Sequence, residues 1–228
     1  GNLARRVISF TVDTIAPNLT INPVITPTNV TTQTITGTFT DINIANITVN
    51  GVLATLGAGT YSALVNLTEG SNPINVVATD LANNIGTSST NILLDTIAPV
   101  TTDNSPVTWQ IADFIVTLTP TDSGSGVYYT TYNLDSAGWV NGTSIPITIT
   151  GNHTIQYYSV DNAGNVENIK TTYALLDKDI PTVTNLTINP NTVFTGQSTT
   201  IGVNVVDNVD VANVTAEVTL PDSSVNIV

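Results

Sequence analysis

Apolar and polar residues alternate with a period of two along most of this chain. Within residues 34–40, Ile35 and Phe39 face one way while the threonines between them face the other, as in a half-buried β-strand. The next alternating segment ends at Asn50-Gly51, a pair that favours a tight hairpin turn. No long stretch shows the periodicity of an amphipathic helix. The pattern therefore predicts an all-β fold.

The same alternation predicts the inward faces of further strands. In chain order these are Ile47 and Val49; Tyr61, Ala63, Val65 and Leu67; Ile74, Val76 and Ala78; Thr90, Ile92 and Leu94; Phe114, Val116 and Leu118; Ile145, Ile147 and Ile149; and Ile155 and Tyr157. Residues 127–132 form an aromatic strand in which Tyr128 and Tyr129 are expected on opposite faces. About seven short strands per unit, separated by turn residues, predict antiparallel β-sandwiches.

A five-residue motif, Asp95-Thr-Ile-Ala-Pro99, divides the chain into equal units. It recurs at residues 13–17 and, in degraded form, as Asp177-Lys-Asp-Ile-Pro181, so the three prolines are 82 positions apart (99 − 17 and 181 − 99). We expect module 1 at 13–94, module 2 at 95–176, an incomplete module 3 at 177–228, and in residues 1–12 the last strand of a preceding module. Proline favours extended geometry, so these linkers should be short and semi-rigid.

An incomplete third module would expose strand edges and apolar surface. Two explanations fit this expectation. The chain is an excerpt of a longer repeat protein, or a strand such as residues 7–12 of another copy completes the open sheet by strand addition.

Composition excludes several classes of function. With 4 Lys+Arg against 17 Asp+Glu, the formal net charge of −13 opposes binding to a phosphate backbone. The absence of cysteine rules out disulfides, thiolate nucleophiles and cysteine metal sites. No apolar run is long enough to span a membrane, and residues 1–6 do not have the pattern of a signal peptide. Any export signal or anchor would lie outside this segment.

Motifs along the chain resemble known families of extracellular module. The segments DTIAPNLTI, ITGTFTD, ITVNGV and INVVATDLANN in residues 14–94 resemble bacterial Ig-like domains of the glucodextranase domain B type. TLTPTDSGSGV, AGWV and HTIQYYSVDNAGNVE in residues 96–176 look like the Ig-like repeat of bacterial and archaeal surface proteins, and NLTINPNTVFTGQSTTIGVNVVD is similar to archaeal surface-protein Ig or PKD-like modules. The resemblance implies tandem Ig-like sandwiches in spacers, adhesin stalks or envelope components, and weakly suggests an archaeal source. It implies no activity.

Acidic residues recur at nearly fixed distances from each linker proline. Asp41, Asp122 and Asp207 lie 24, 23 and 26 positions after it, and Asp80 and Asp161 lie 63 and 62 positions after it (41 − 17, 122 − 99, 207 − 181, 80 − 17 and 161 − 99). In such a sandwich these loops share one end with the incoming linker. We therefore expect three acidic groups: Asp13, Asp41 and Asp80; Asp95, Asp122 and Asp161; and Asp177, Asp179, Asp207 and Asp210.

Acid-lined junctions suit a hard cation. Ca²⁺ takes six to eight oxygen ligands from carboxylates, amides and carbonyls, so it is a candidate cofactor that would stiffen each joint. The alternative is that these Asp and Asn side chains only bond their own backbone in turns.

Eight Asn-x-Thr sequons are candidates for N-glycosylation if the protein is exported. They are Asn18, Asn29, Asn46, Asn66, Asn141, Asn152, Asn185 and Asn213. Asn46, Asn66 and Asn213 alternate out of phase with an apolar face and should meet solvent.

Catalysis has little support in the sequence, and no catalytic residue is assigned. His153 is the only histidine, no serine lies in a Gly-x-Ser-x-Gly turn, and acids that recur with the repeat are better explained by the repeat than by one active site. Aromatic residues concentrate in module 2, where exposed rings could stack on sugars or, alternatively, pack over the core.

The sequence therefore predicts a non-catalytic, extracellular structural segment of a stalk, filament, sheath or surface layer. The second hypothesis is an adhesin or carbohydrate-binding module of a cell-surface protein, and the third is an accessory module of a secreted enzyme. The expected partners are neighbouring modules and, through strand addition, other copies of the chain. Nucleic acid is not expected as a partner.

Overall fold

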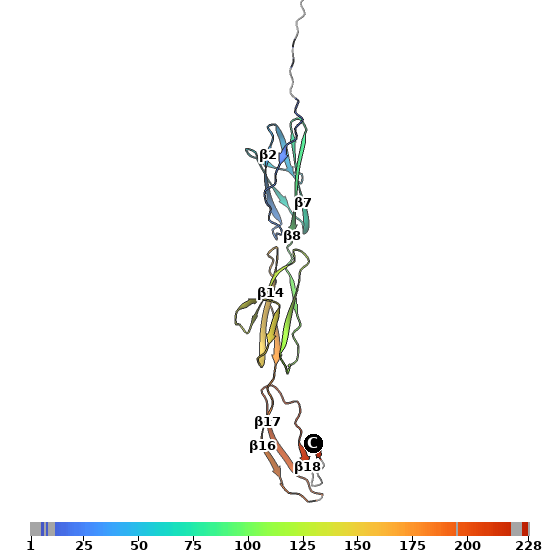
Figure 1. Ribbon diagram of the computed structural model, residues 1–228, viewed down its shortest axis with the longest axis vertical. Coiled ribbons are helices and arrows are strands. Elements are labelled where there is room, and N and C mark those ends of the chain that lie inside the picture. Colours follow the sequence, from blue (N-terminus) through green and yellow to red (C-terminus); the bar gives the residue numbers. More distant parts are fainter. Residues whose placement is uncertain (1–5, 7, 9–11, 195, 220–224, 228) are drawn as a thin grey trace, which may run out of the picture.

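The computed structural model describes residues 6, 8, 12–194, 196–219 and 225–227. All regular structure in this part of the chain is β-strand, which confirms the all-β prediction. In this part of the chain there is no helix long and apolar enough to cross a membrane. Strand pairing stays within module 1, module 2 or module 3, and the three groups of strands follow one another along the long axis of the molecule (Figure 1).

Module 1 is a sandwich of two four-stranded antiparallel sheets. Their strand orders are β1-β2-β6-β5 and β4-β3-β7-β8. The strands are β1 (Asn18–Leu19), β2 (Thr32–Thr40), β3 (Ile44–Val49), β4 (Val52–Leu53), β5 (Thr55–Leu56), β6 (Thr60–Asn66), β7 (Gly70–Asp80) and β8 (Ile85–Leu94).

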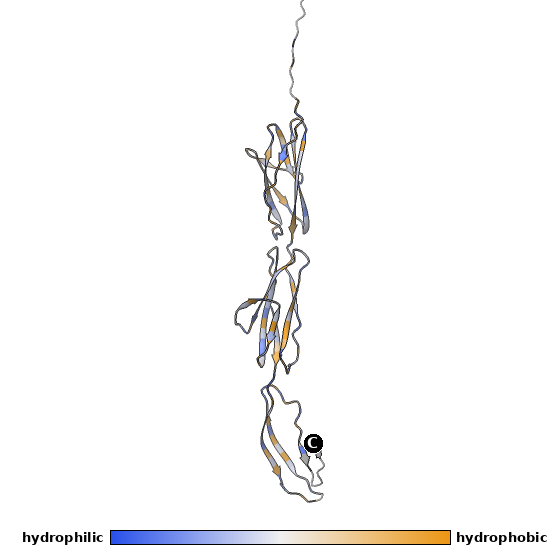
Figure 2. Ribbon diagram, viewed as in Figure 1, coloured by the Kyte–Doolittle hydropathy of each residue, from blue (hydrophilic) through white to orange (hydrophobic). Residues whose placement is uncertain are grey.

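The predicted inward residues of module 1 form its core. Ile35, Ile47, Val49, Ile74 and Val76 have no exposed surface, and apolar positions alternate with polar ones along the strands in Figure 2. The predicted hairpin turn is also confirmed, since Asn50 and Gly51 both have positive φ. Burial of alternate apolar side chains between two sheets is what stabilises the module.

Module 2 repeats the architecture with a three-stranded and a four-stranded sheet. Their orders are β13-β10-β9 and β12-β11-β14-β15. The strands are β9 (Val100–Asp103), β10 (Phe114–Thr121), β11 (Val127–Leu134), β12 (Trp139–Asn141), β13 (Ser144–Ile147), β14 (Gly151–Asp161) and β15 (Lys170–Leu176). The core includes Val116, Ile145, Ile147, Ile155 and Tyr157.

Two details of module 2 differ from the prediction. Ile149 is 72% exposed because β13 ends at Ile147 and the chain turns away from the core. Tyr128 and Tyr129 do not simply alternate, because a β-bulge shifts the register of β11 between Val127 and Tyr129. Their rings lie 5.4 Å apart in an edge-to-face contact. An extra residue in one strand overrides the period of two.

Module 3 consists of two separate hairpins. β16 (Thr182–Asn189) pairs with β17 (Thr200–Val206), and β18 (Glu217–Thr219) pairs with β19 (Val225–Ile227). Apolar side chains on the first hairpin are exposed, among them Val183, Leu186 and Ile188. The predicted strand donor, residues 7–12, falls largely outside the described residues, and Ile8 and Val12 within it are exposed.

The core assignment of module 2 predicts the effect of two matched substitutions. Ile145→Ala removes a fully buried side chain and should lower the free energy of unfolding of module 2 by about 2–5 kcal/mol. Ile115→Ala, on the adjacent strand, removes a side chain that is 55% exposed and should change it by less than about 0.5 kcal/mol. Urea unfolding followed by tryptophan fluorescence measures both, and equal losses would contradict the assignment.

Candidate metal centres at the module junctions

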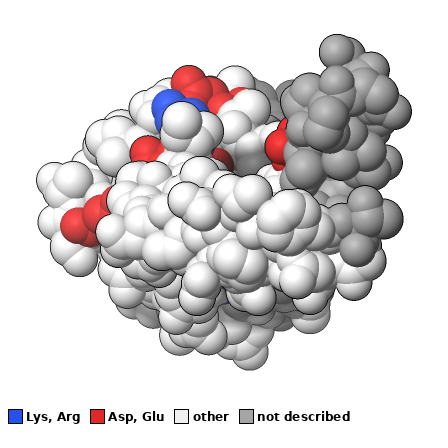
Figure 3. All heavy atoms as spheres, turned by 90° about the horizontal axis from the view of Figure 1, so that it is seen from below, with Lys and Arg blue, Asp and Glu red and all other residues white. Residues whose placement is uncertain are grey.

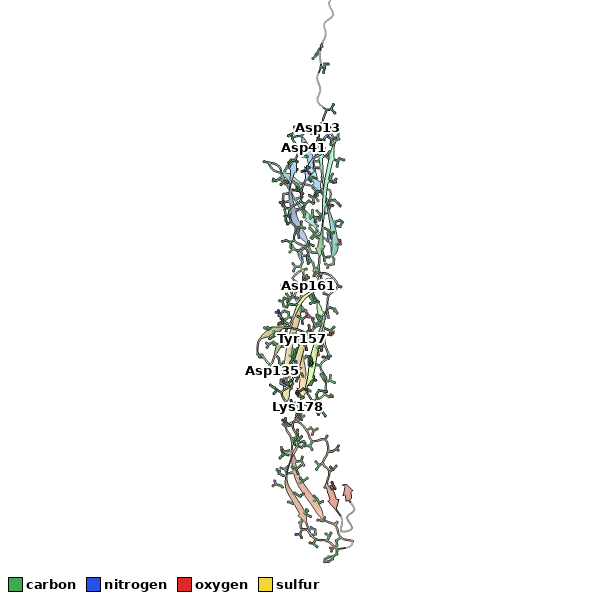
Figure 4. All side chains as sticks on the ribbon, in the orientation of Figure 1. Asp13, Asp41, Asp135, Tyr157, Asp161 and Lys178 are labelled. Carbon is green, nitrogen blue, oxygen red and sulfur yellow. The ribbon has the colours of Figure 1, made fainter. Side chains whose placement is uncertain are left out.

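The structure brings two of the three predicted acidic groups together. Asp13, Asp41 and Asp80 each place a carboxylate oxygen within 4.8 Å of the other two, and Asp95, Asp122 and Asp161 do the same. Figure 4 shows Asp13 and Asp41 at one end of module 1 and Asp161 at the corresponding end of module 2. In each group one carboxylate comes from the linker, one from the loop after the module's second strand and one from the end of its longest strand.

The third predicted group does not assemble among the described residues. There Asp177, Asp179, Asp207 and Asp210 are not within metal-binding distance of one another in any set of three. Asp177 Oδ1 accepts from the Asp179 N–H, and Asp207 Oδ1 accepts from the Val209 N–H. These are local turn contacts, the alternative that the sequence left open.

Hydrogen bonds from backbone N–H groups hold each linker carboxylate in place. Asp95 is fully buried; its Oδ2 accepts from the Ser125 N–H at 2.6 Å and its Oδ1 from the Ile97 N–H at 3.1 Å. A Cβ at Gly124 would overlap the Asp95 carboxylate, so this close approach requires glycine. The loop of module 2 is therefore built around the carboxylate of the linker.

The second group contains one unsatisfied oxygen. Asp122 Oδ2 accepts from the N–H groups of Gly124 and Gly126, whereas Asp122 Oδ1 is buried and has no hydrogen-bond partner. An unpaired buried carboxylate oxygen is costly. It is one of the atoms that a cation between the three carboxylates would contact.

Two asparagines complete the groups, and sequence reasoning did not assign them. Asn84 Nδ2 donates to Asp80 Oδ2 at 2.7 Å and to the backbone carbonyl of Asp13 at 3.2 Å. In module 2, Asn165 Nδ2 donates to Asp161 Oδ2 at 2.7 Å and to the Asp95 carbonyl at 2.8 Å. Each asparagine follows its aspartate by four positions, and this repeated Asp-x-x-x-Asn spacing was the available signal.

Hydrogen bonds hold the pKa values of Asp95 and Asp80 below the ordinary value. Burial alone would raise the pKa of Asp95, but hydrogen bonding by Ser125 and the Ile97 N–H holds it below its ordinary value. Burial would also raise the pKa of Asp80, but the side chain and N–H of Asn84 hold it below its ordinary value. No described Lys or Arg pairs with either group. Converging anions without a cationic side chain are what a hard cation requires.

Asp95 also joins module 1 to module 2. Its N–H donates to the carbonyl of Thr28 in module 1 at 2.9 Å, while its carboxylate binds module 2. The next residue, Thr96, donates through its Oγ1 to Glu69 Oε2 of module 1 at 2.9 Å. The linker is thus fixed on both sides.

The second junction keeps the backbone contact to the preceding module and adds an ion pair to it. The Asp177 N–H donates to the Gln110 carbonyl, as Asp95 does to Thr28. Lys178, which stands where the first junction has Thr96, reaches back to Asp113 Oδ1 at 2.7 Å. The degraded motif therefore keeps an attachment to module 2 by different chemistry.

Other predicted sites lie away from the junctions. All eight sequon asparagines are exposed. His153 Nδ1 lies 2.6 Å from Asp135 Oδ2, and its Nε2 donates to the Ile149 carbonyl at 2.7 Å. Both ring nitrogens are engaged, and neither faces a serine hydroxyl. The arrangement is that of a structural ion pair rather than a nucleophile with its base.

Comparisons with known proteins identify similar sequences. Residues 17–96 match the family described as glucodextranase, domain B. Over 95 residues the chain is 42% identical to Bacillopeptidase F of Bacillus subtilis (strain 168), covering 41% of this chain and 7% of that protein. The chain therefore spans only a small part of this relative's length.

Solved structures of modular proteins are also similar. Fibronectin(III)-like modules of Clostridium thermocellum CbhA are 16% identical with a TM-score of 0.40, covering 69% of this chain and 93% of theirs. A tetra-tandem repeat from the extending region of a large adhesion protein is 22% identical with a TM-score of 0.31, covering 93% and 62%.

The His153–Asp135 pair predicts a pH effect in module 2. Burial alone would lower the pKa of His153, but the bonds to Asp135 and Ile149 raise it above its ordinary value. The pair's contribution should therefore be fully present below pH 6.5 and lost as the pH rises through the folded-state pKa. Because the Asp135 side chain is 46% exposed, we expect a loss of about 0.5–1 kcal/mol.

Unfolding free energies of the wild type and His153→Gln between pH 5.5 and 9 test this effect. The variant should lack the wild-type decrease, and module 1, which has no histidine, serves as an internal control. Parallel pH profiles for the two proteins would contradict the assignment.

Residues 17–96 thus carry the glucodextranase domain B match, and modules 1 and 2 are tandem Ig-like β-sandwiches.

Proposed function

We propose that this chain is a non-catalytic, extracellular segment that holds sandwich modules in a semi-rigid row within a larger stalk, filament, sheath or surface-layer protein. The observation that carries the proposal is the junction at Asp95, where one buried residue bonds both modules. A flexible tether would need no such contacts.

The surface charge fits a spacer better than a protein that binds anions or acts on anionic substrates. The end of the molecule that Figure 3 shows is mostly uncharged, with scattered acidic groups. Similarity to a part of Bacillopeptidase F and to an adhesion-protein repeat supports extracellular placement. None of the described carboxylate groups faces a histidine and serine in a catalytic arrangement.

Distance measurements between modules 1 and 2 test the rod directly. The chain has no cysteine, so cysteines introduced at the exposed Thr87 and Thr171 would carry spin labels without interference. We expect one narrow distance distribution, which Asp95→Ala broadens because it removes the carboxylate contacts to module 2. Asp113→Ala, away from this junction, is the matched control. A broad distribution in the wild type would contradict the proposal.

Calcium bound by the Asp13 group and by the Asp95 group is the second part of the proposal. Three converging carboxylates, including that of Asp122 with its buried unpaired oxygen, offer oxygen ligands to one ion at the Asp95 group. A bound cation would offset the repulsion between the carboxylates and tie the linker to two loops.

Calorimetric titration with Ca²⁺ should detect two ions per chain, with dissociation constants of about 10⁻⁴ to 10⁻³ M, the range of extracellular modules. Asp122→Asn should reduce the stoichiometry to one, because the group at Asp13 remains. Asp113→Asn should leave it at two. The absence of heat and of any change in melting temperature would eliminate calcium.

A carbohydrate-binding module is the second candidate, favoured by aromatic residues on module 2. Trp139, Tyr158, Val166 and Ile169 line a shallow hollow of about 300 Å³ together with Glu167. Sugar rings stack on exposed aromatic faces. A glycan array probed with unglycosylated chain tests this candidate, and it is discarded if no glycan is bound.

A further inference from the structure

One sequon differs from the other seven in its sequence neighbour. Asn141 follows Trp139 by two positions, whereas the residues two positions before the other sequon asparagines are Ala16, Pro27, Ile44, Leu64, Thr150, Val183 and Val211. Residues i and i+2 of a strand point to the same face and lie about 7 Å apart. Because β12 spans Trp139–Asn141, its indole and amide side chains share one face of the sheet.

Strand register shows that this is the outer face of module 2. Asn141 pairs with Thr131, and Thr131 pairs with Tyr158. Tyr157, the neighbour of Tyr158, is 3% exposed and lies in the core, so Tyr158 and the residues aligned with it point outward. Asn141, Thr131 and Tyr158 therefore form one row across three strands.

Trp139 leans over this row. Its ring centroid lies 5.0 Å from that of Tyr158, with 69° between the ring planes. Thr131, on the same face, is only 3% exposed, and its Oγ1 donates to the Val140 carbonyl at 3.1 Å. Trp139 itself remains 44% exposed. The indole is thus held in place by an edge contact while keeping free surface beside Asn141.

The Asn141 amide is available for modification. The residue is exposed, it lies on β12 at the edge of its sheet, and its side chain makes no hydrogen bond to the described residues. Three asparagines outside the sequons differ from Asn141 in this respect. Asn72, Asn84 and Asn165 use their amide nitrogens to hold loops.

From this juxtaposition we propose that Asn141 carries an N-linked glycan whose first sugar ring packs on the indole of Trp139. The proposal rests on the export included in the proposed function. In the modification, Asn141 Nδ2 bonds to the anomeric carbon of a lipid-phosphate-linked sugar. The anomeric C–O bond breaks, the phosphate leaves with the electron pair, and the amide nitrogen loses one proton. The apolar face of the attached sugar then covers indole surface that is otherwise in water.

Expression of the full chain through a secretory pathway that modifies Asn-x-Thr sequons tests the proposal. Mass spectrometry of the peptides should find Asn141 occupied. Calorimetry should show that Asn141→Gln lowers the melting temperature of module 2 by about 4 °C, the shift expected from loss of about 1 kcal/mol in a domain of this size. In a Trp139→Thr background the same substitution should have no effect, which separates stacking from a general effect of glycosylation.

Two further measurements guard against a merely structural role of Trp139. Asn152→Gln removes another exposed sequon of the same module, two positions after Thr150, and should leave the melting temperature unchanged. In a Trp109→Phe background, which leaves Trp139 as the only tryptophan, enzymatic removal of the glycan should increase quenching of its fluorescence by acrylamide.

Three results would overturn the inference. Asn141 could be bare while other sequons are occupied, or it could be occupied without coupling to Trp139. Alternatively, unglycosylated chain could bind free glycans through Trp139, which would assign this face to a ligand from elsewhere. None of these results affects the spin-label distances, so failure here is distinguishable from failure of the proposed rod.

Discussion

A buried carboxylate at the boundary between two modules is the constraint on which this structure depends. Asp95 has no exposed surface, so its oxygens need hydrogen-bond donors in fixed positions. Module 2 supplies Ser125 N–H to the carboxylate, and module 1 supplies the Thr28 carbonyl to the Asp95 N–H. Rotation of one module against the other would break one of these contacts. Bending the joint would therefore leave a buried charge without its hydrogen-bond partners, which costs free energy.

The other linkers are held by comparable contacts, but these contacts differ in strength. Asp13 occupies the equivalent position before module 1 and meets Asp41 and Asp80. At the second junction Asp207 bonds its own backbone, Lys178 pairs with Asp113 of module 2 at the surface, and Asn208 Nδ2 of module 3 donates to Asp179 Oδ2. Exposed ion pairs contribute little. The first junction should consequently be the stiffer of the two, and module 3 the less constrained neighbour.

Patterns within short stretches of sequence predicted the structural features that depend on nearby residues. Period-two alternation identified the buried faces of both sandwiches, and the 82-residue repeat placed the acids that converge at Asp80 and Asp161. Alternation failed at Ile149, where the strand ends two residues earlier, and at Tyr128, where a bulge inserts an extra residue. Neither event has a local signature as strong as a proline or a glycine turn.

The remaining features that the sequence did not predict depend on contacts between residues far apart in the chain. Asn165 bonds the carbonyl of Asp95, 70 positions earlier in the chain, and only the folded loops bring the two together. Asp207 had nearly the expected spacing from the linker proline, but in the described part of module 3 it joins no group of three acidic side chains. Spacing alone could not show whether a loop faces the linker or its own turn.

The most direct test of the account is ¹⁵N relaxation of the backbone amides in modules 1 and 2 of the intact chain. If the Asp95 junction fixes the modules, both sets of amides should fit one anisotropic rotational diffusion tensor, with linker residues 95–99 as rigid as the strands. Separate tensors for the two modules, together with fast motion confined to residues 95–99, would contradict the claim that the joint is held from both sides.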